Sequence, residues 1–79
     1  MDIPARLLDE VFADCNGRYP IEACGLLAGP RDGPGPTERW RMRNVAHHPR
    51  HRYVMDPEEQ MDTWRAIEGT GHRVFAIYH

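Results

Sequence analysis

The segment YPIEACGLLAG, residues 19–29, decides the fold of this 79-residue chain. Residues 23–28 form a short, continuous apolar run, which is typical of a strand buried inside a sheet. Glu22 stands just before this run, where a carboxylate is positioned by rigid backbone. We expect Gly25 and Gly29 to allow close approach of neighbouring backbone, because glycine has no Cβ. The sequence on either side must supply the elements that bury this strand.

Upstream of the segment, apolar residues recur at helical spacing from residue 3 to residue 15. This spacing predicts an amphipathic helix, with its apolar stripe covered by a sheet or by another helix. We expect Asp2 to cap the helix and Pro4 to lie in its first turn. Asn16 and Gly17 are a fitting C-terminal stop.

Downstream, residues 29–36 carry three glycines and three prolines, which predicts a turn. Residues 37–45 then alternate between apolar and basic side chains, which predicts a half-buried strand. If the turn is a hairpin, this strand is antiparallel to the first one. We place Trp40 and Met42 on its buried face. The opposite face carries the row of arginines at positions 39, 41 and 43.

The last third of the chain predicts a polar loop, a helix and a strand. Residues 46–52 are polar and 53–55 form a brief extended piece. Asp56 as N-cap and Pro57 in the first position mark a helix start, and glycines at 69 and 71 end the helix. Residues 73–78 are nearly all apolar, so we expect a central strand buried on both faces.

Composition sets limits on the class of protein. The chain is 41% hydrophobic and 28% charged, as in an ordinary globular domain, and its net charge of −2 gives no general attraction to nucleic acid or acidic lipid. No run approaches the ~20 apolar residues of a membrane span, so a cytoplasmic protein is expected. Cys15 and Cys24 fit no CxxC motif, and we expect two buried, reduced thiols. Cys24, on a strand without a basic neighbour, is not expected to be a nucleophile.

Three stretches of this sequence are similar to motifs of one enzyme family. Residues 20–29 match P-x-E-x-C/A-G-L-L-x-G, Asn44 is followed by Y-x-M-D-P at 53–57 before a helix, and residues 74–79 form a strand ending in histidine. In this order they resemble the JAMM/MPN+ zinc metallopeptidases. The likeness is closest to the bacterial Mec-like peptidases, which act on ubiquitin-like sulfur carriers.

The resemblance implies an α/β fold of the MPN type, similar to zinc deaminases, with a curved mixed sheet flanked by helices. It also implies that residues 1–79 are the N-terminal part of a single domain, truncated after a central strand. The family continues its last strand into a His-x-His motif. Its second histidine, an oxyanion serine and an aspartate ligand would all lie beyond residue 79.

The function implied is zinc-dependent hydrolysis of a peptide or isopeptide bond at the C-terminal tail of a ubiquitin-like sulfur carrier. Glu22 matches the family's general base, and His79 matches its first zinc ligand. Catalytic zinc usually holds three protein ligands and one water, and a nearby carboxylate takes the proton of that water. One histidine and one glutamate cannot complete such a site, so the 79-residue chain alone is expected to be inactive.

Two other functions remain open at this point. The chain could be a non-catalytic MPN-type scaffold that binds a partner, although Glu22 argues against this alternative. It could also be a fragment that completes its sheet through a partner strand or a homodimer.

For several residues the sequence allows either a structural or solvent-exposed role or a role in binding. We expect His47, His48 and His51 to lie in a solvated loop, with contact to the substrate tail as the alternative. Trp40 and Trp64 are expected in the core. The arginine row is expected to be a solvated face, or alternatively a docking surface for an acidic carrier.

Overall fold

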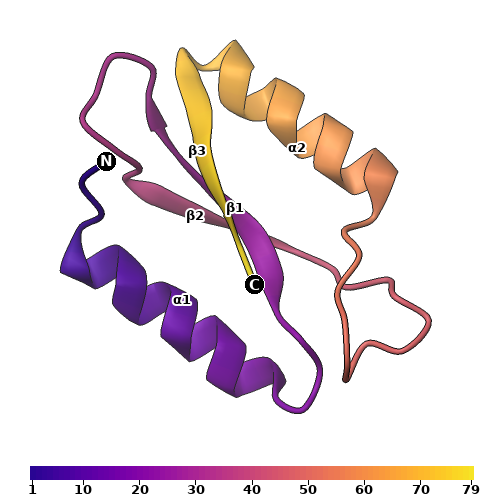
Figure 1. Cartoon of the computed structure of the whole chain (residues 1–79). Coiled ribbons are helices and arrows are strands. Elements are labelled where there is room, and N and C mark those ends of the chain that lie inside the picture. Colours follow the sequence, from indigo (N-terminus) through magenta and orange to yellow (C-terminus); the bar gives the residue numbers. More distant parts are fainter.

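Strand β1 (Cys24–Pro30) lies at the centre of a three-stranded sheet with the order β2-β1-β3 (Figure 1). The computed structural model describes residues 1–79. Its other elements are α1 (Ala5–Arg18), β2 (Glu38–Met42), α2 (Pro57–Gly69) and β3 (His72–Tyr78). Both β2 and β3 pair with β1 in antiparallel fashion. None of the helices is long and apolar enough to cross a membrane.

The two helices cover opposite faces of the sheet, so the molecule has three layers (Figure 1). Alternate residues of β1 point to opposite faces. Cys24, Leu26 and Ala28 pack with Ile67 of α2. Leu27 packs on the other side against Leu7 of α1. The segment that is most apolar in sequence is therefore the strand that joins both cores.

The expected α/β architecture is confirmed, but the sheet differs in two details. All strand pairs are antiparallel, whereas a mixed sheet requires a parallel pair as well. β3 lies at the edge, not at the centre, and Ile77 on it is 47% exposed. The central position belongs to β1, because its pairing with β2 on one side leaves the other side for β3.

Helix α2 begins as the sequence predicts, whereas α1 does not. The Asp56 carboxylate accepts a hydrogen bond from the Glu58 N–H at 3.1 Å, as an N-cap does. Asp2 makes no cap on α1, and its own N–H donates to the Pro34 carbonyl instead. The helix also continues through the expected stop at Asn16 to Arg18, because the Arg18 side chain bonds back to Asp14 one turn earlier.

Both tryptophans are at the margin of the core, so the expectation that they lie inside it is wrong. Trp40 is 36% exposed and Trp64 is 37% exposed. Met42, 2% exposed, is the residue of β2 that reaches the core. Trp40 instead lies on the outer strand of the sheet, where its indole N–H donates to the Glu38 carboxylate at 3.1 Å.

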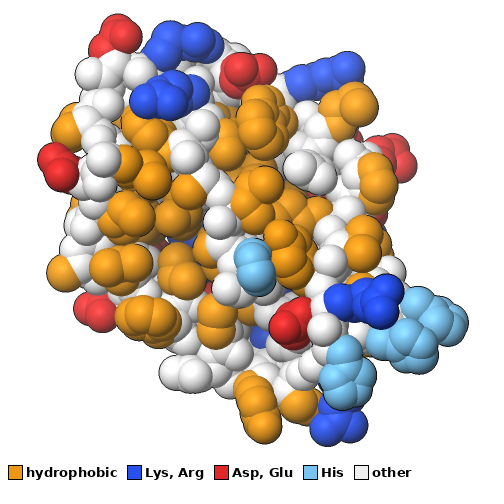
Figure 2. Space-filling model, viewed as in Figure 1, with side chains coloured by type: hydrophobic (Ala, Val, Ile, Leu, Met, Phe, Trp, Pro, Cys, Tyr) orange, Lys and Arg blue, Asp and Glu red, His pale blue; other side chains and the backbone are white.

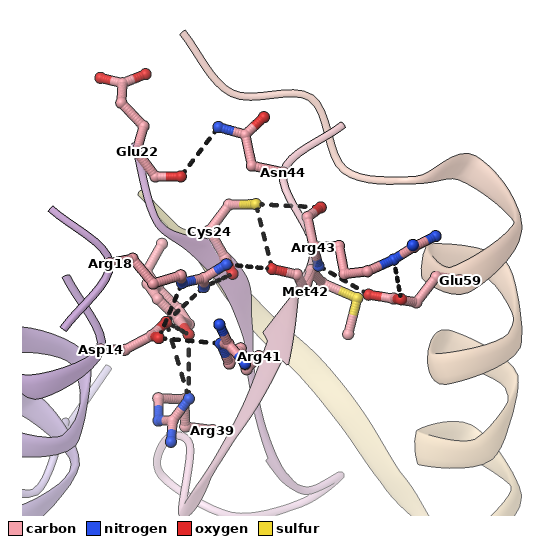
Figure 3. Close-up of polar contacts among 11 residues, drawn as sticks. Asp14, Arg18, Glu22, Cys24, Arg39, Arg41, Met42, Arg43, Asn44 and Glu59 are labelled. Atoms are coloured by element: carbon pink, nitrogen blue, oxygen red, sulfur yellow. Dashed lines mark hydrogen bonds and ion pairs between the residues drawn. The ribbon is translucent and has the colours of Figure 1, made fainter. Parts of the chain in front are cut away.

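The arginine row is not simply a solvated face, because a buried carboxylate on α1 gathers two of its members. Asp14, 6% exposed at its side chain, lies 3.3 Å from Arg41 and 3.9 Å from Arg39. Arg43, the third member, pairs with Asp56 at 2.7 Å and with Glu59 at 3.3 Å. These arginines therefore tie β2 to α1 and the end of β2 to α2 (Figure 3).

Asp14 also holds two further groups that are nearly buried. Arg18 donates to it at 2.6 Å, and the Tyr78 hydroxyl donates to it at 2.7 Å. Arg18 in turn donates to the carbonyls of Met42 at 2.6 Å and Cys24 at 2.8 Å. One carboxylate thus connects the first helix with all three strands.

Burial and hydrogen bonding shift the acid–base behaviour of this group. Burial acts to raise the pKa of Asp14, but hydrogen bonds from Arg18 and Tyr78 outweigh it and hold that pKa below the usual range. Burial and the bond to Asp14 raise the pKa of Tyr78 to about 12. At neutral pH the Asp14 carboxylate is therefore ionised, and the Tyr78 hydroxyl stays protonated and donates the hydrogen bond between them.

Neither cysteine forms a disulfide. Cys24 is fully buried as expected, while Cys15 is only half-buried. A basic neighbour of Cys24, which the sequence did not reveal, is supplied by Arg18. Burial nevertheless raises the pKa of the Cys24 thiol. The thiol is therefore protonated at neutral pH, in keeping with its expected lack of nucleophilic character.

The two glycines of the central strand make room for different groups. A Cβ on Gly29 would lie 2.8 Å from the backbone carbonyl oxygen of Gly35, so backbone approaches closely there, as expected. A Cβ on Gly25 would overlap the side-chain ring of Tyr78, not backbone. Gly25 therefore lets the Tyr78 ring cross β1 and reach Asp14.

Replacing Asp14→Asn is expected to lower the free energy of unfolding by about 2–3 kcal/mol, because it leaves the nearly buried Arg18 charge without its counter-ion. The matched control is Asp9→Asn on the exposed side of the same helix. This substitution should change the free energy of unfolding by less than ~0.5 kcal/mol. Urea unfolding measures both, and equal values for the two variants would contradict the role given to Asp14.

The same pair of variants has a defined pH dependence. Because the folded pKa of Asp14 lies below the unfolded value of 3.8, its stabilisation is present above that value and is lost as pH falls through the folded pKa. The free energy of unfolding of the unsubstituted chain should therefore fall more steeply below pH 3.8 than that of the Asp14→Asn variant. Urea midpoints measured between pH 7 and pH 2 test the difference.

Candidate active site

Glu22 lies between α1 and β1, and its backbone is held on both sides. Its N–H donates to the Pro49 carbonyl at 2.8 Å. Its carbonyl accepts from the Asn44 amide at 3.0 Å. Figure 3 shows the Glu22 side chain directed away from Asn44, with its carboxylate outside this network. The backbone is thus fixed by the fold while the carboxylate stays available.

The Asn44 side chain organises the loop that follows β2. Its amide donates to the carbonyls of Glu22, Pro49 and Arg52, at 3.0, 3.3 and 3.0 Å. Its oxygen accepts from the N–H groups of Ala46 at 3.0 Å and Val54 at 3.1 Å. Every bond is to backbone, so this amide replaces the ladder that a regular strand would have supplied.

The antiparallel register of β1 and β3 brings the two expected site residues together. Gly25 pairs with Tyr78, so continuing the register by one residue places His79 opposite Cys24. Glu22 is two residues earlier on the same chain. The His79 ring stacks on the Tyr53 ring, with centroids 4.4 Å apart and planes 22° apart. Tyr53 therefore limits the orientation of the imidazole.

Glu22 and His79 line one pocket of about 290 Å³. Its other lining residues are Cys15, Tyr19, Pro20, Ile21, Ala23 and Arg50. The peptide bond between Tyr19 and Pro20 in this wall is cis. The pocket thus combines a carboxylate, an imidazole and a guanidinium with an otherwise mainly apolar wall. Arg50 was not among the residues predicted for the site, because it belongs to a loop expected to be polar and solvated.

The residues of this chain do not fit a complete zinc site. Nowhere in residues 1–79 do three or more His, Cys, Asp or Glu side chains come together as a metal cluster. A catalytic zinc ion usually takes three protein ligands. The pocket is lined by the His79 imidazole, the Glu22 carboxylate and the Cys15 thiol, but these three groups do not come together as a metal cluster. The three histidines of the loop, at positions 47, 48 and 51, are exposed as expected and add no such cluster.

Comparison with known proteins places this chain in a family. Residues 4–79 match the prokaryotic homologs of the JAB domain, and the chain belongs to that family. JAB and MPN are names for the same kind of domain, so the resemblance stated from the motifs is confirmed.

Two kinds of curated relative illustrate the family. The chain is 36% identical over 77 residues to the CysO-cysteine peptidase of Mycobacterium tuberculosis, covering 98% of this chain and 52% of that protein. It is 41% identical over 63 residues to the desampylase of Haloferax volcanii, and this match covers 80% of this chain and 45% of the desampylase. The chain therefore spans about half the length of the curated relatives it matches.

A solved structure agrees with this assignment. The solution structure of a protein from Desulfitobacterium hafniense superposes with a TM-score of 0.75 at 28% sequence identity. The match covers 92% of this chain and 51% of the other. The helices and strands described above thus correspond to about half of a known, longer fold.

Replacing Asn44→Ala is expected to lower the free energy of unfolding by about 3 kcal/mol, because several backbone groups lose their partner at once. The amides of Ala46 and Val54, which donate to Asn44, should then exchange with solvent much faster. Amide hydrogen exchange followed by NMR measures this effect. The chain's other asparagine gives the control: Asn16→Ala, on the exposed side of α1, should leave both amides protected. Unchanged protection in Asn44→Ala would contradict the assignment.

Proposed function

We propose that this chain contributes the general base and one metal ligand to a JAB-type metallopeptidase site. The supporting observation is that Glu22 and His79, which are distant in sequence, line the same pocket. In this proposal Glu22 is the base and His79 is a zinc ligand. The further ligands come from outside residues 1–79, because the chain itself offers too few.

We also propose that residues 1–79 are the N-terminal half of a single domain. The matched relatives are about twice as long, which supports this division. β3 has a free edge, and apolar side chains gather across α1 and β3 in Figure 2. Phe12 is 60% exposed and Ile77 is 47% exposed. The second half of the domain would cover this surface.

The chemistry assigned to Glu22 needs only a carboxylate in the right place. It accepts a proton from the attacking water, whose oxygen adds to the carbonyl carbon of the substrate amide. It then gives a proton to the leaving nitrogen as the C–N bond breaks, so one carboxylate serves as base and then as acid.

The substrate proposed is the C-terminal tail of a ubiquitin-like sulfur-carrier protein, joined to an amino acid or to another protein. The names of the two curated relatives, CysO-cysteine peptidase and desampylase, support a hydrolase of this kind. We propose that the protein acts in the cytoplasm, and a homodimer stays a prediction.

The second candidate function is a non-catalytic partner-binding domain. The position of Glu22 in one pocket with His79 argues against it. A whole protein that binds the carrier but neither holds zinc nor cleaves the conjugate would support this alternative.

The test of the proposed function is Glu22→Gln in the whole protein, assayed with zinc on a carrier–amino acid conjugate. We expect kcat to fall by about 10²–10⁴-fold, the usual contribution of a general base, while zinc content is unchanged. The control is Glu10→Gln, an exposed glutamate on α1 that should leave kcat unchanged. A Glu22→Gln enzyme that keeps kcat within a factor of three would overturn the assignment.

A further inference from the structure

The loop at residues 46–52 carries basic side chains that have no acidic partner. Five of the ten arginines form ion pairs with carboxylates, namely those at positions 6, 18, 39, 41 and 43. Arg50 and Arg52 form none, and neither do the histidines of the same loop. Blue and pale-blue side chains accordingly gather over this loop in Figure 2.

Arg50 differs from the rest of this loop because it lines the pocket of Glu22 and His79. Its side chain makes no hydrogen bond and no ion pair within the chain. It is the only arginine or lysine among the lining residues. The pocket thus contains a guanidinium whose donors are free for a ligand.

Backbone hydrogen bonds on both sides of Arg50 fix its position relative to Glu22. The preceding residue, Pro49, accepts from the Glu22 N–H at 2.8 Å and from Asn44 at 3.3 Å. Two residues later, the Arg52 carbonyl accepts from the Asn44 amide at 3.0 Å. The backbone N–H of Arg52 donates to the His48 carbonyl at 3.2 Å. Arg50 is therefore carried by a turn that is attached directly to the backbone of the base.

An unpaired guanidinium that lines a pocket is well suited to bind a carboxylate group of a ligand. Its planar fork of N–H donors forms paired hydrogen bonds with a carboxylate, and these charge-assisted bonds are stronger than neutral ones. The mainly apolar wall of the pocket leaves few other groups to compete for it.

We propose that Arg50 binds the free α-carboxylate of the amino acid that leaves during hydrolysis. This inference rests on the proposed function, in which Glu22 protonates the leaving nitrogen. In an α-amino acid the carboxylate carbon lies about 2.5 Å from that nitrogen, so both groups enter the same pocket. In an isopeptide the leaving nitrogen is a lysine ε-amine, separated from its backbone carbonyl by the whole side chain.

The favoured substrate is a carrier whose tail ends in one α-linked amino acid with a free carboxyl group. A carrier joined through a lysine side chain lacks the group that Arg50 binds. Arg50 would thus be a specificity-determining residue for removal of a single terminal residue.

Binding of two matched peptides tests this inference without requiring metal or turnover. The probes are N-acetyl-Gly-Gly-Ala with a free carboxylate and the same peptide with a C-terminal amide, each titrated into the metal-free whole protein and followed by NMR. We expect at least tenfold tighter binding of the acid, with shifts at the amides of Glu22 and Arg50. Ionic strength is kept at or below about 0.1 M, because salt weakens exposed charge pairs.

Substitutions then assign the preference to one side chain. Arg50→Ala should bind the acid as weakly as the amide, and Arg50→Lys should recover part of the preference. Arg52→Ala is the control, because Arg52 lies in the same loop but outside the pocket lining and holds the turn only through its backbone. It should keep the full preference.

The possible outcomes separate this inference from the proposed function. Equal binding of acid and amide, no binding of either, or a preference that survives Arg50→Ala would overturn the role of Arg50. The role of Glu22 would then still be decided by the Glu22→Gln assay. Loss of the preference in Arg50→Ala, together with full activity of Glu22→Gln, would support a carboxylate pocket and reject the proposed base.

Discussion

The position of Tyr78 across Gly25 is the constraint on which the rest of the structure depends. Without a side chain at Gly25, the Tyr78 ring passes over the central strand, and its hydroxyl donates to Asp14 on the first helix at 2.7 Å. This contact locks the register of β1 and β3 while it attaches α1 to the sheet. His79 is the next residue, so the register that holds the core also delivers the imidazole to the pocket.

A second constraint, the Asn44 amide, positions the other half of the pocket. It bonds only to backbone groups, which span Glu22 and the loop from Ala46 to Val54. Glu22 and the basic loop are therefore parts of one hydrogen-bonded unit. Because His79 directly follows β3 and Glu22 lies just before β1, the pocket forms only where these two units meet.

Sequence patterns predicted the parts of this fold that follow local rules. The apolar run at 23–28, the turn rich in glycine and proline and the Asp56 cap each depend on neighbouring residues, and each is found in the structure. The predictions were wrong where contacts between residues distant in sequence determine the structure. The end of α1 depends on Arg18 reaching the carbonyls of Cys24 and Met42 on the strands, and no local pattern shows those partners.

The candidate site shows the same division. Glu22 and His79 were found from motifs, whereas their placement in one pocket follows from the pairing of β1 with β3. Arg50 was missed because, in sequence, it is one of several basic residues in a loop. Only the bonds of Pro49 to Glu22 and Asn44 place Arg50 beside Glu22. Likewise, the edge position of β3 depends on strand order, which its apolar composition does not encode.

The most direct test of the central claim, that Glu22 and His79 belong to one metallopeptidase pocket, is anomalous diffraction at the zinc edge from crystals of the whole protein. We predict one zinc peak bonded to the His79 imidazole, in the pocket lined by Glu22, with the Glu22 carboxylate facing it but not among its protein ligands. A zinc ion bound elsewhere, or a whole-protein structure in which Glu22 and His79 line different surfaces, would contradict it.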